Sequence, residues 1–279
     1  PFSENPEIYI RSTMDISNHP IDEEPVKSDY PKACIQAIVT MLCKEFIDLK
    51  TTQKPTDSSP NMPWPKALLF DLDLTLIRSR SFWRHAEQVL LGYLGFDEQM
   101  DVHHCYNGLH ATDAGKAIHA LLKPTASEDE CVRVFREALI EQFATQPIEA
   151  MPGAVDLVHR YAGRLPMAIA SGSPQEGIHA AAVALGIHGT LDAAISSESV
   201  ANGKPAPDVF VKAARELDVA VEDCVVFEDS VVGATAAVRA GMQCIVVPDQ
   251  PESAFAGLPV HLVKSLADVD EDLFATTRR

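Results

Sequence analysis

The chain has 279 residues, of which 46% are hydrophobic and 23% are charged, so neither a collagen-like repeat nor a wholly disordered chain is expected. Forty acidic against 23 basic side chains give a formal net charge of −17, which repels nucleic-acid phosphates and anionic lipid, so neither nucleic acid nor a membrane is an expected partner. No apolar run approaches the roughly 18 residues of a membrane span, and no secretory signal is evident, which favours a cytoplasmic location.

Residues 1–65 differ in composition from the rest of the chain. They hold nine of the 19 prolines and none of the 14 glycines. Within residues 29–50, apolar side chains recur at helical spacing, at Ile35, Ile38, Leu42, Phe46 and Leu49. We therefore expect an N-terminal arm, 1–65, with one amphipathic helix at 29–50, whose apolar stripe packs on the main domain or on a protein partner of unknown identity.

From Lys66 onward, short apolar segments alternate with amphipathic patterns. Strands are predicted at 67–70, 166–170, 193–195, 224–227 and 244–247, and helices at 153–163, 174–185, 207–217 and 231–240. This alternation is typical of an α/β fold with a doubly wound, Rossmann-like parallel sheet. Residues 80–150 are helical in pattern and too long for one crossover, so they predict a helical insert in a core formed by 66–79 and 151–279.

Polar residues follow the predicted strands, and they are the candidates for function. Asp71 and Asp73 follow the first strand, Ser171 and Gly172 the second, and Glu228 and Asp229 the fourth, while Lys204 precedes a helix. Ligands of an open parallel sheet bind at the carboxyl ends of its strands, so these residues are expected to meet at one edge. Each is also explained singly as a turn residue, a helix cap or a solvated charge, but those interpretations do not explain their shared placement.

The four carboxylates of this set would repel one another without a bound cation. Hard oxygen ligands with open positions favour Mg²⁺. Beside the metal, Lys204 and the hydroxyl and amide groups of Ser171 and Gly172 supply donors for an anion. The set therefore fits an oxyanion such as phosphate.

Four segments resemble, in sequence and in order, the motifs of the haloacid dehalogenase superfamily. They are Phe70–Leu76, Ala170–Pro174, Gly203–Phe210 and Val226–Ser230. The resemblance is closer to the branch that contains β-phosphoglucomutase, 2-deoxyglucose-6-phosphatase and pseudouridine-5'-phosphatase. It covers about residues 66–275 and implies that residues 80–150 are a helical cap, with hinges near 79–81 and 151–153.

The resemblance also implies a role for each candidate residue. Asp71 would be the nucleophile that forms an aspartyl-phosphate, and Asp73 would be the general acid and base. Ser171, Gly172 and Lys204 would bind the phosphoryl group. The function implied is that of a Mg²⁺-dependent phosphatase acting on a small phosphorylated metabolite, such as a sugar phosphate.

The same resemblance implies a ligand set for the metal. Mg²⁺ would be held by Asp71, by the backbone carbonyl of Asp73 and by Asp229, with Glu228 as support. One departure from the family pattern lies close to this set, because Leu74 stands where a glycine is usual. A second departure is Arg78, which replaces a common acid and does not remove a catalytic group.

The insert contains the candidates for substrate specificity. Residues 107–113 resemble the specificity loop of this branch, which makes Gly108 and His110 candidate substrate contacts, although the segment also fits a simple helix start. His103 and His104 are expected to be solvated, because adjacent residues on a helix point apart and no third metal ligand is nearby.

Two alternatives to the phosphatase remain at this point. The mutases of this branch carry a histidine where this chain has Trp83, and an arginine in the cap loop where it has His110 and Ala111, which favours hydrolysis over a phosphosugar mutase. The second alternative is a non-catalytic binding module, and the intact Asp71 and Asp73 argue against it.

Overall fold

The structure is a computed structural model that describes residues 65–277, and the helix expected at 29–50 lies outside them. The described strands are β1 (Ala67–Phe70), β2 (Met167–Ser171), β3 (Ala193–Ser196), β4 (Cys224–Glu228), β5 (Gln243–Val246) and β6 (His261–Leu262). They form one parallel sheet in the order β3-β2-β1-β4-β5-β6. The chain runs outward from β1 to β3 and then crosses to β4, so the ends of β1 and β4 flank the point where ligands bind in such sheets.

The central strands are buried on both faces, which explains their continuous apolar sequences. Every residue of β1, β2 and β4 is buried. Alternate side chains of β1 enter two separate cores, with Leu68 and Phe70 on one face and Leu69 on the other. Phe70 pairs in register with Phe227 of β4, and their rings stack at 4.9 Å. This register places the residues that follow them, Asp71 and Glu228, side by side.

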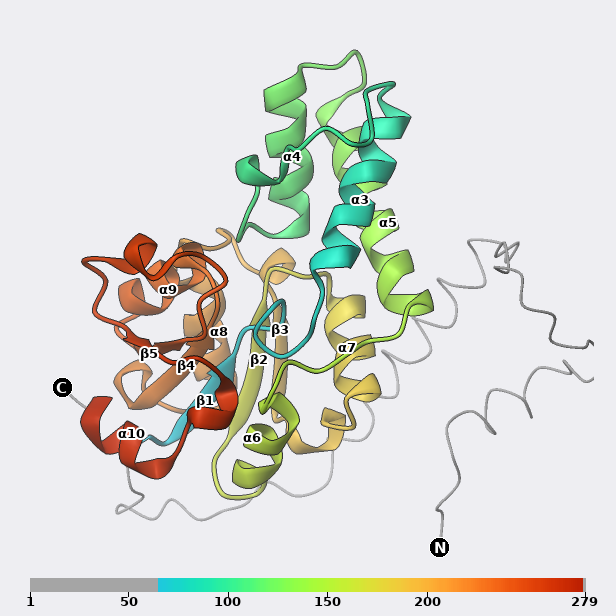
Figure 1. Ribbon diagram of the computed structural model, residues 1–279. Helices are drawn as coiled ribbons and strands as arrows, with labels where there is room; N and C mark the ends of the chain where they lie inside the picture. Colours follow the sequence, from blue (N-terminus) through green and yellow to red (C-terminus); the bar gives the residue numbers. More distant parts are fainter. Residues whose placement is uncertain (1–64, 278–279) are drawn as a thin grey trace, which may run out of the picture.

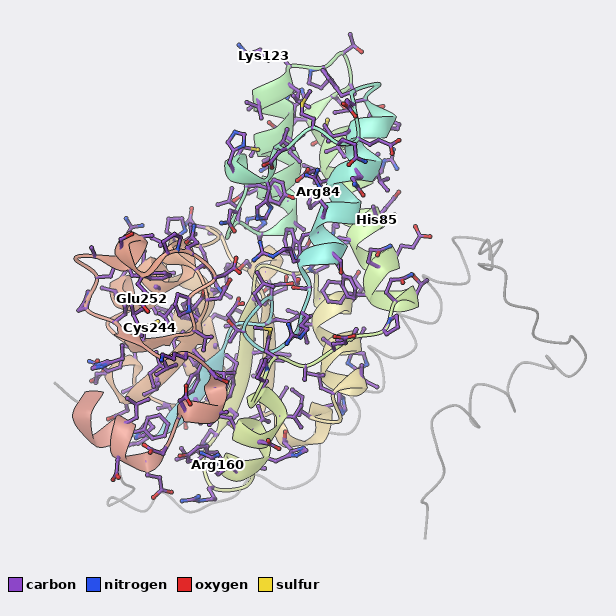
Figure 2. The ribbon with its side chains drawn as sticks, in the orientation of Figure 1. Arg84, His85, Lys123, Arg160, Cys244 and Glu252 are labelled. Carbon is purple, nitrogen blue, oxygen red and sulfur yellow. The ribbon has the colours of Figure 1, made fainter. Side chains whose placement is uncertain are left out.

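Helices cover both faces of the sheet, as the sequence predicts for a doubly wound fold (Figure 1). One face packs against α6 (Ala154–Tyr161), α7 (Gln175–Ala184) and α10 (Glu271–Thr277), and the other against α8 (Asp208–Glu216) and α9 (Val231–Arg239). Short 3-10 helices lie at His103–Cys105, His188–Thr190, Ser197–Ser199, Val221–Asp223, Glu252–Phe255 and Leu266–Asp268. Side chains fill the space between the layers, as Cys244 of β5 does, whereas Glu252 lies at the surface (Figure 2).

Three of the four α-helices between β1 and β2 form a group of their own: α3 (Arg80–Tyr93), α4 (Ala111–Leu122) and α5 (Glu128–Thr145). They pack on one another beyond one end of the sheet (Figure 1). Helix α5 begins with a capping box, in which the Ser127 hydroxyl accepts from the Glu130 N–H and the Glu130 carboxylate accepts from the Ser127 N–H. We call residues 80–150 the insert.

The two connections between the sheet and the insert lie side by side. The Arg78 N–H donates to the Glu149 carbonyl, and the Met151 N–H donates to the Leu76 carbonyl, at 2.9 and 2.8 Å. Gly153 follows with a φ of 79°, and a Cβ there would lie 2.2 Å from the Ala267 nitrogen, so only glycine fits. The insert therefore leaves and re-enters the core at one place.

Candidate active site

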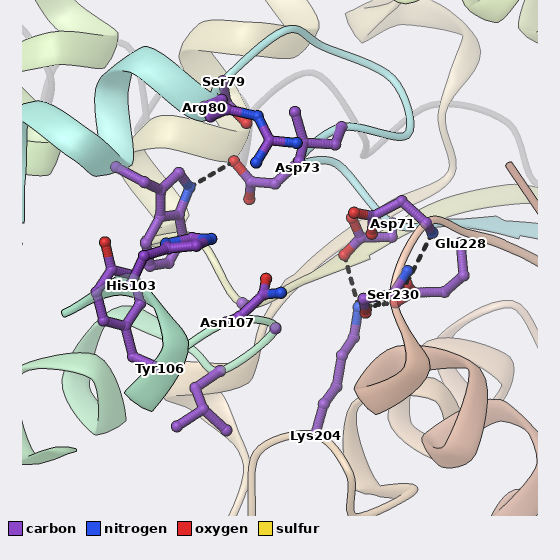
Figure 3. A pocket seen from close by; sticks show the side chains of 16 residues that line it. Asp71, Asp73, Ser79, Arg80, His103, Tyr106, Asn107, Lys204, Glu228 and Ser230 are labelled. Atoms are coloured by element: carbon purple, nitrogen blue, oxygen red, sulfur yellow. Dashed lines mark hydrogen bonds and ion pairs between the residues drawn. The ribbon is translucent and has the colours of Figure 1, made fainter. Parts of the chain in front are cut away.

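A pocket lies between the carboxyl end of the sheet and the insert (Figure 3). The core half of its wall consists of Asp71, Asp73, Leu74, Gly172, Lys204, Glu228, Asp229 and Ser230. The insert half, together with the residue before it, consists of Ser79, Arg80, Trp83, His103, Tyr106, Asn107, Gly108 and Leu109. The strand-end residues predicted from sequence thus meet at one edge. Ser171 precedes Gly172 in the chain and is fully buried.

A buried ion cluster forms the centre of the core half. The Lys204 Nζ donates to Asp71 Oδ1 and to Glu228 Oε1, each at 2.6 Å, and only 4% of Lys204 is exposed. Carboxylate oxygens of Asp71, Glu228 and Asp229 lie within 4.8 Å of one another. The Asp73 carboxylate is not part of this cluster. Within the described residues, this is a three-carboxylate group that could hold a metal ion.

The local chain geometry explains how Glu228 comes to be buried and charged. Its Oε2 accepts hydrogen bonds from the N–H groups of Asp229 and Ser230 and from the Ser230 hydroxyl, at 3.0 to 3.1 Å. The carboxylate lies against the start of α9, where a Cβ on Gly233 would be 1.7 Å from Glu228 Oε1. Glycine is therefore required at position 233 for this close approach.

The pKa values of the three carboxylates reflect burial and a shortage of positive charge. Burial raises the pKa of Asp71 to about 8, although the charge of Lys204 opposes the shift. Burial, with the charges of Glu228 and Asp71, also raises the pKa of Asp229. Burial acts the same way on Glu228, but the charge and hydrogen bond of Lys204, together with the backbone N–H groups of Ser230 and Asp229, outweigh it and lower the pKa of that carboxyl. Three acids share one ammonium group, and a divalent cation would complete the charge balance.

Asp73 lies beside the cluster and faces the insert. Its Oδ2 accepts from the Ser173 hydroxyl at 2.6 Å and from the Ser171 hydroxyl at 3.3 Å, and its Oδ1 accepts from the indole N–H of Trp83 at 2.8 Å. The next residue, Leu74, has a φ of 59°, which explains why glycine is usual there. Asp73 thus joins the core half of the pocket to the insert half.

The loop before α4 packs directly on the core loops around the pocket. The Ala111 N–H donates to the Gly172 carbonyl at 3.2 Å. A Cβ on Gly203 would lie 2.1 Å from His110 Cδ2, and a Cβ on Gly108 would lie 2.9 Å from Val232 Cβ. These close approaches depend on glycine on both sides of the contact.

The two candidate specificity residues have different positions. Gly108 lines the pocket, with a φ of 79°. His110 is buried outside the lining and pairs through Nε2 with Asp113 at 2.8 Å, while burial lowers the pKa of its imidazole. The structure therefore gives His110 a role in packing the loop on Gly203.

Several residues that line the pocket are not among the candidates predicted from the sequence. His103, expected to be solvated, is half-buried, lines the pocket and contacts the Tyr106 ring edge-on at 4.9 Å, whereas His104 is exposed. Tyr106 is buried, and its hydroxyl donates to Glu87, a fully buried carboxylate, at 2.7 Å. Arg80 forms an ion pair with Asp249, in the loop after β5. No local sequence signal marks these long-range partners.

The sequence model of the haloacid dehalogenase-like hydrolases matches residues 65–241. The chain belongs to this family. It is 32% identical over 184 residues to fructose-1-phosphate phosphatase YqaB of Escherichia coli, which covers 64% of this chain and 95% of the relative. It is 29% identical to a probable pseudouridine-5'-phosphatase of Drosophila melanogaster, covering 74% of this chain and 92% of the relative.

Solved structures of the family share the fold. CbbY of Rhodobacter sphaeroides, in complex with xylulose-(1,5)bisphosphate, superposes with a TM-score of 0.64 and 27% identity, over 73% of this chain and 95% of that one. A β-phosphoglucomutase of Clostridium difficile superposes with a TM-score of 0.66 and 21% identity, over 76% and 98%. The predicted superfamily, the α/β fold and the assignment as a hydrolase are confirmed. Among residues 65–277, no helix has the length and apolar character to span a membrane.

Proposed function

We propose that this protein is a Mg²⁺-dependent phosphatase that hydrolyses a small phosphorylated metabolite, in particular a sugar phosphate, through an aspartyl-phosphate. The observation that carries the proposal is the buried cluster of Asp71, Lys204, Glu228 and Asp229, with the carboxylate of Asp73 facing the same pocket. The relatives named for activity on fructose-1-phosphate and pseudouridine-5'-phosphate support a monoester of a sugar or a sugar-like compound.

Asp71 is the proposed nucleophile. Its carboxylate attacks phosphorus while the bond to the leaving oxygen breaks, and Asp73 gives that oxygen a proton. Asp73 then takes a proton from the water that attacks the aspartyl-phosphate, which releases phosphate and restores both acids. Lys204, at 2.6 Å from Asp71, holds the nucleophile in place, and with Ser171 and Gly172 it offers donors to the phosphoryl oxygens.

The residues of the cluster fit a bound Mg²⁺. When present, the ion supplies positive charge that stabilises the phosphoryl group during transfer. Asp71, Asp229 and the carbonyl of Asp73 are the proposed ligands. Glu228 supports them without ligation, because one of its oxygens accepts from Lys204 and the other from three donors at Asp229 and Ser230.

The insert is proposed to act as a cap over the pocket, and residues 66–79 and 151–279 as the catalytic core. The adjacent connections at Arg78 and Met151 support one hinge region. The contacts of residues 107–111 with Gly172 and Gly203 support a cap that is closed in this structure.

A panel of phosphorylated metabolites, assayed for released phosphate with and without Mg²⁺, tests the proposal. A phosphatase releases phosphate from some of them in Mg²⁺, a mutase isomerises a sugar phosphate without net release, and a binding module does neither. Absence of phosphate release from every compound would disprove the proposed activity.

The role of Asp73 has a separate test, in Asp73→Asn. A sugar alkoxide needs a proton to leave, whereas a nitrophenolate leaves without one, so the single-turnover rate on the sugar ester should fall by roughly 10² to 10⁴ and that on nitrophenyl phosphate much less. Equal losses on both esters would show that Asp73 does not transfer the proton.

A further inference from the structure

The carboxylate of Asp73 is held from two sides by hydrogen-bond donors. The core supplies the hydroxyls of Ser171 and Ser173 to Oδ2, and the insert supplies the indole N–H of Trp83 to Oδ1, at 2.8 Å. An indole N–H can donate but cannot accept a hydrogen bond or carry a proton between groups. Trp83 can therefore orient the carboxylate of Asp73 without exchanging a proton with it.

The position of the indole is determined by the insert. Trp83 lies on α3 and is 9% exposed, and its ring stacks with Tyr106 at 6.2 Å and contacts Phe135 of α5 at 5.9 Å. Tyr106 is fixed in turn by its hydrogen bond to the buried Glu87. Three elements of the insert thus place one donor on a carboxylate that belongs to the core.

We propose that Trp83 is a positioning residue for Asp73, whose indole N–H holds Oδ1 so that the group that protonates the leaving oxygen is aligned. This inference rests on the proposed phosphatase function and adds to it a residue of the insert that orients the acid. With Oδ1 released, the carboxylate rotates about its side-chain bonds and is held only through Oδ2. A misplacement of about 1 Å in a reacting group can cost roughly 10²-fold in rate.

The test is Trp83→Phe, which removes the N–H and keeps an aromatic ring against Tyr106 and Phe135. Single-turnover rates are measured on a sugar phosphate and on nitrophenyl phosphate, beside wild type and Asp73→Asn. We expect the rate on the sugar ester to fall by about 10- to 10²-fold, with nitrophenyl phosphate changing by less than about threefold. Adding Trp83→Phe to Asp73→Asn should cost the sugar ester less than about threefold more, because both changes act on one proton transfer.

The control is Phe82→Leu, which weakens the packing of α3 on Phe143 and leaves the hydrogen bond to Asp73 intact. It is expected to change both esters by the same factor, as any purely structural loss would. If Trp83→Phe fails to fold, Trp83 is replaced with benzothienylalanine, in which sulfur takes the place of the N–H in a ring of nearly the same shape, and the same pattern is expected.

Three results would overturn the inference: equal losses on the two esters, no loss on the sugar ester, or losses that add in the double variant. Failure of the proposed function is recognised separately. In that case the wild-type protein releases no phosphate from either ester, whereas failure of the inference leaves wild-type hydrolysis and the Asp73→Asn pattern unchanged.

Discussion

The two halves of the pocket differ in chemistry. The core half contains four carboxylates and a lysine, most of them buried and paired with one another, whereas the insert half presents two aromatic rings, an imidazole, an amide and one guanidinium, that of Arg80. The charged half can serve every phosphate ester, because all share the phosphoryl group. In the proposed mechanism, the insert half faces the rest of the substrate, which differs from one ester to another. Changes in the core half, apart from the proton donor Asp73, should therefore affect all substrates equally, and changes in the insert half should redistribute activity among them.

The largest effect is expected from Asp71→Asn in the core half. A neutral amide cannot attack phosphorus, so turnover should fall by at least about 10⁴-fold on every ester. The fold should persist, because the change removes one of three crowded carboxylates. Phosphate release and thermal unfolding are measured for this variant and for Asp156→Asn, an exposed aspartate of α6 that serves as the matched control. Retained turnover on any one ester would contradict both the nucleophile and the uniformity of the core half.

Removal of metal should have an effect nearly as large and equally uniform. Chelation is expected to stop phosphate release from every ester, and added Mg²⁺ to restore it. Mg²⁺ should also raise the melting temperature of the wild-type protein, since it binds where three acids share one lysine. Calcium at the same concentration serves as the comparison ion for activity. Full activity in chelator would exclude a metal at the cluster.

The core half was predictable because topology alone brings its residues together. Asp71 and Glu228 follow strands that pair in register, and a parallel sheet collects such residues at one edge whatever their separation in the chain. The backbone geometry of the first motif is also kept without its usual residue, because Leu74 has a φ of 59°, a conformation that glycine adopts without strain. The pattern of apolar segments identifies the strands, and the ends of those strands locate the site.

The insert half was not predictable in the same way. Which faces of α3 and α5 meet depends on helix packing, and the partners of Trp83 and Tyr106 lie far away in sequence. His103 was expected to be solvated and lines the pocket, while His110 was expected to contact substrate and packs on Gly203. A periodic pattern identifies a buried face but not the group that it contacts.

A smaller and unequal effect is expected from Asn107→Ala in the insert half. The side-chain amide points into the pocket and can hydrogen-bond a hydroxyl of the leaving group (Figure 3). Losing one such bond should lower kcat/KM for a sugar phosphate by roughly 5- to 100-fold, and for nitrophenyl phosphate by much less. Gln99→Ala, an exposed residue of the insert, is the control. Equal losses on both esters would remove the distinction between the two halves.

The smallest effect concerns Leu74, which belongs to the core half by sequence and lines the pocket with an apolar side chain. Its φ of 59° lies in the left-handed region, which costs a residue with a Cβ about 1–2 kcal/mol. Glycine avoids this cost but adds about 0.5–1 kcal/mol of unfolded-chain entropy relative to alanine. The backbone alone therefore favours glycine over alanine at this position by a few tenths to about 1 kcal/mol, the reverse of the usual order.

Leu74→Gly and Leu74→Ala remove almost the same contacts, so their difference isolates the backbone. We expect Leu74→Gly to be the more stable variant in urea unfolding, by a few tenths to about 1 kcal/mol, and Leu74→Ala to be less stable than the wild-type protein. Greater stability of the alanine variant would mean that residue 74 does not hold a left-handed conformation in solution.

The activities of the two variants then assign Leu74 to one half of the pocket. If its side chain only shapes the space for the leaving group, both variants should change the ratio of rates on two esters by the same factor, as residues of the insert half do. If it instead sets the backbone that carries Asp73, the two variants should differ from each other and affect every ester that needs a proton.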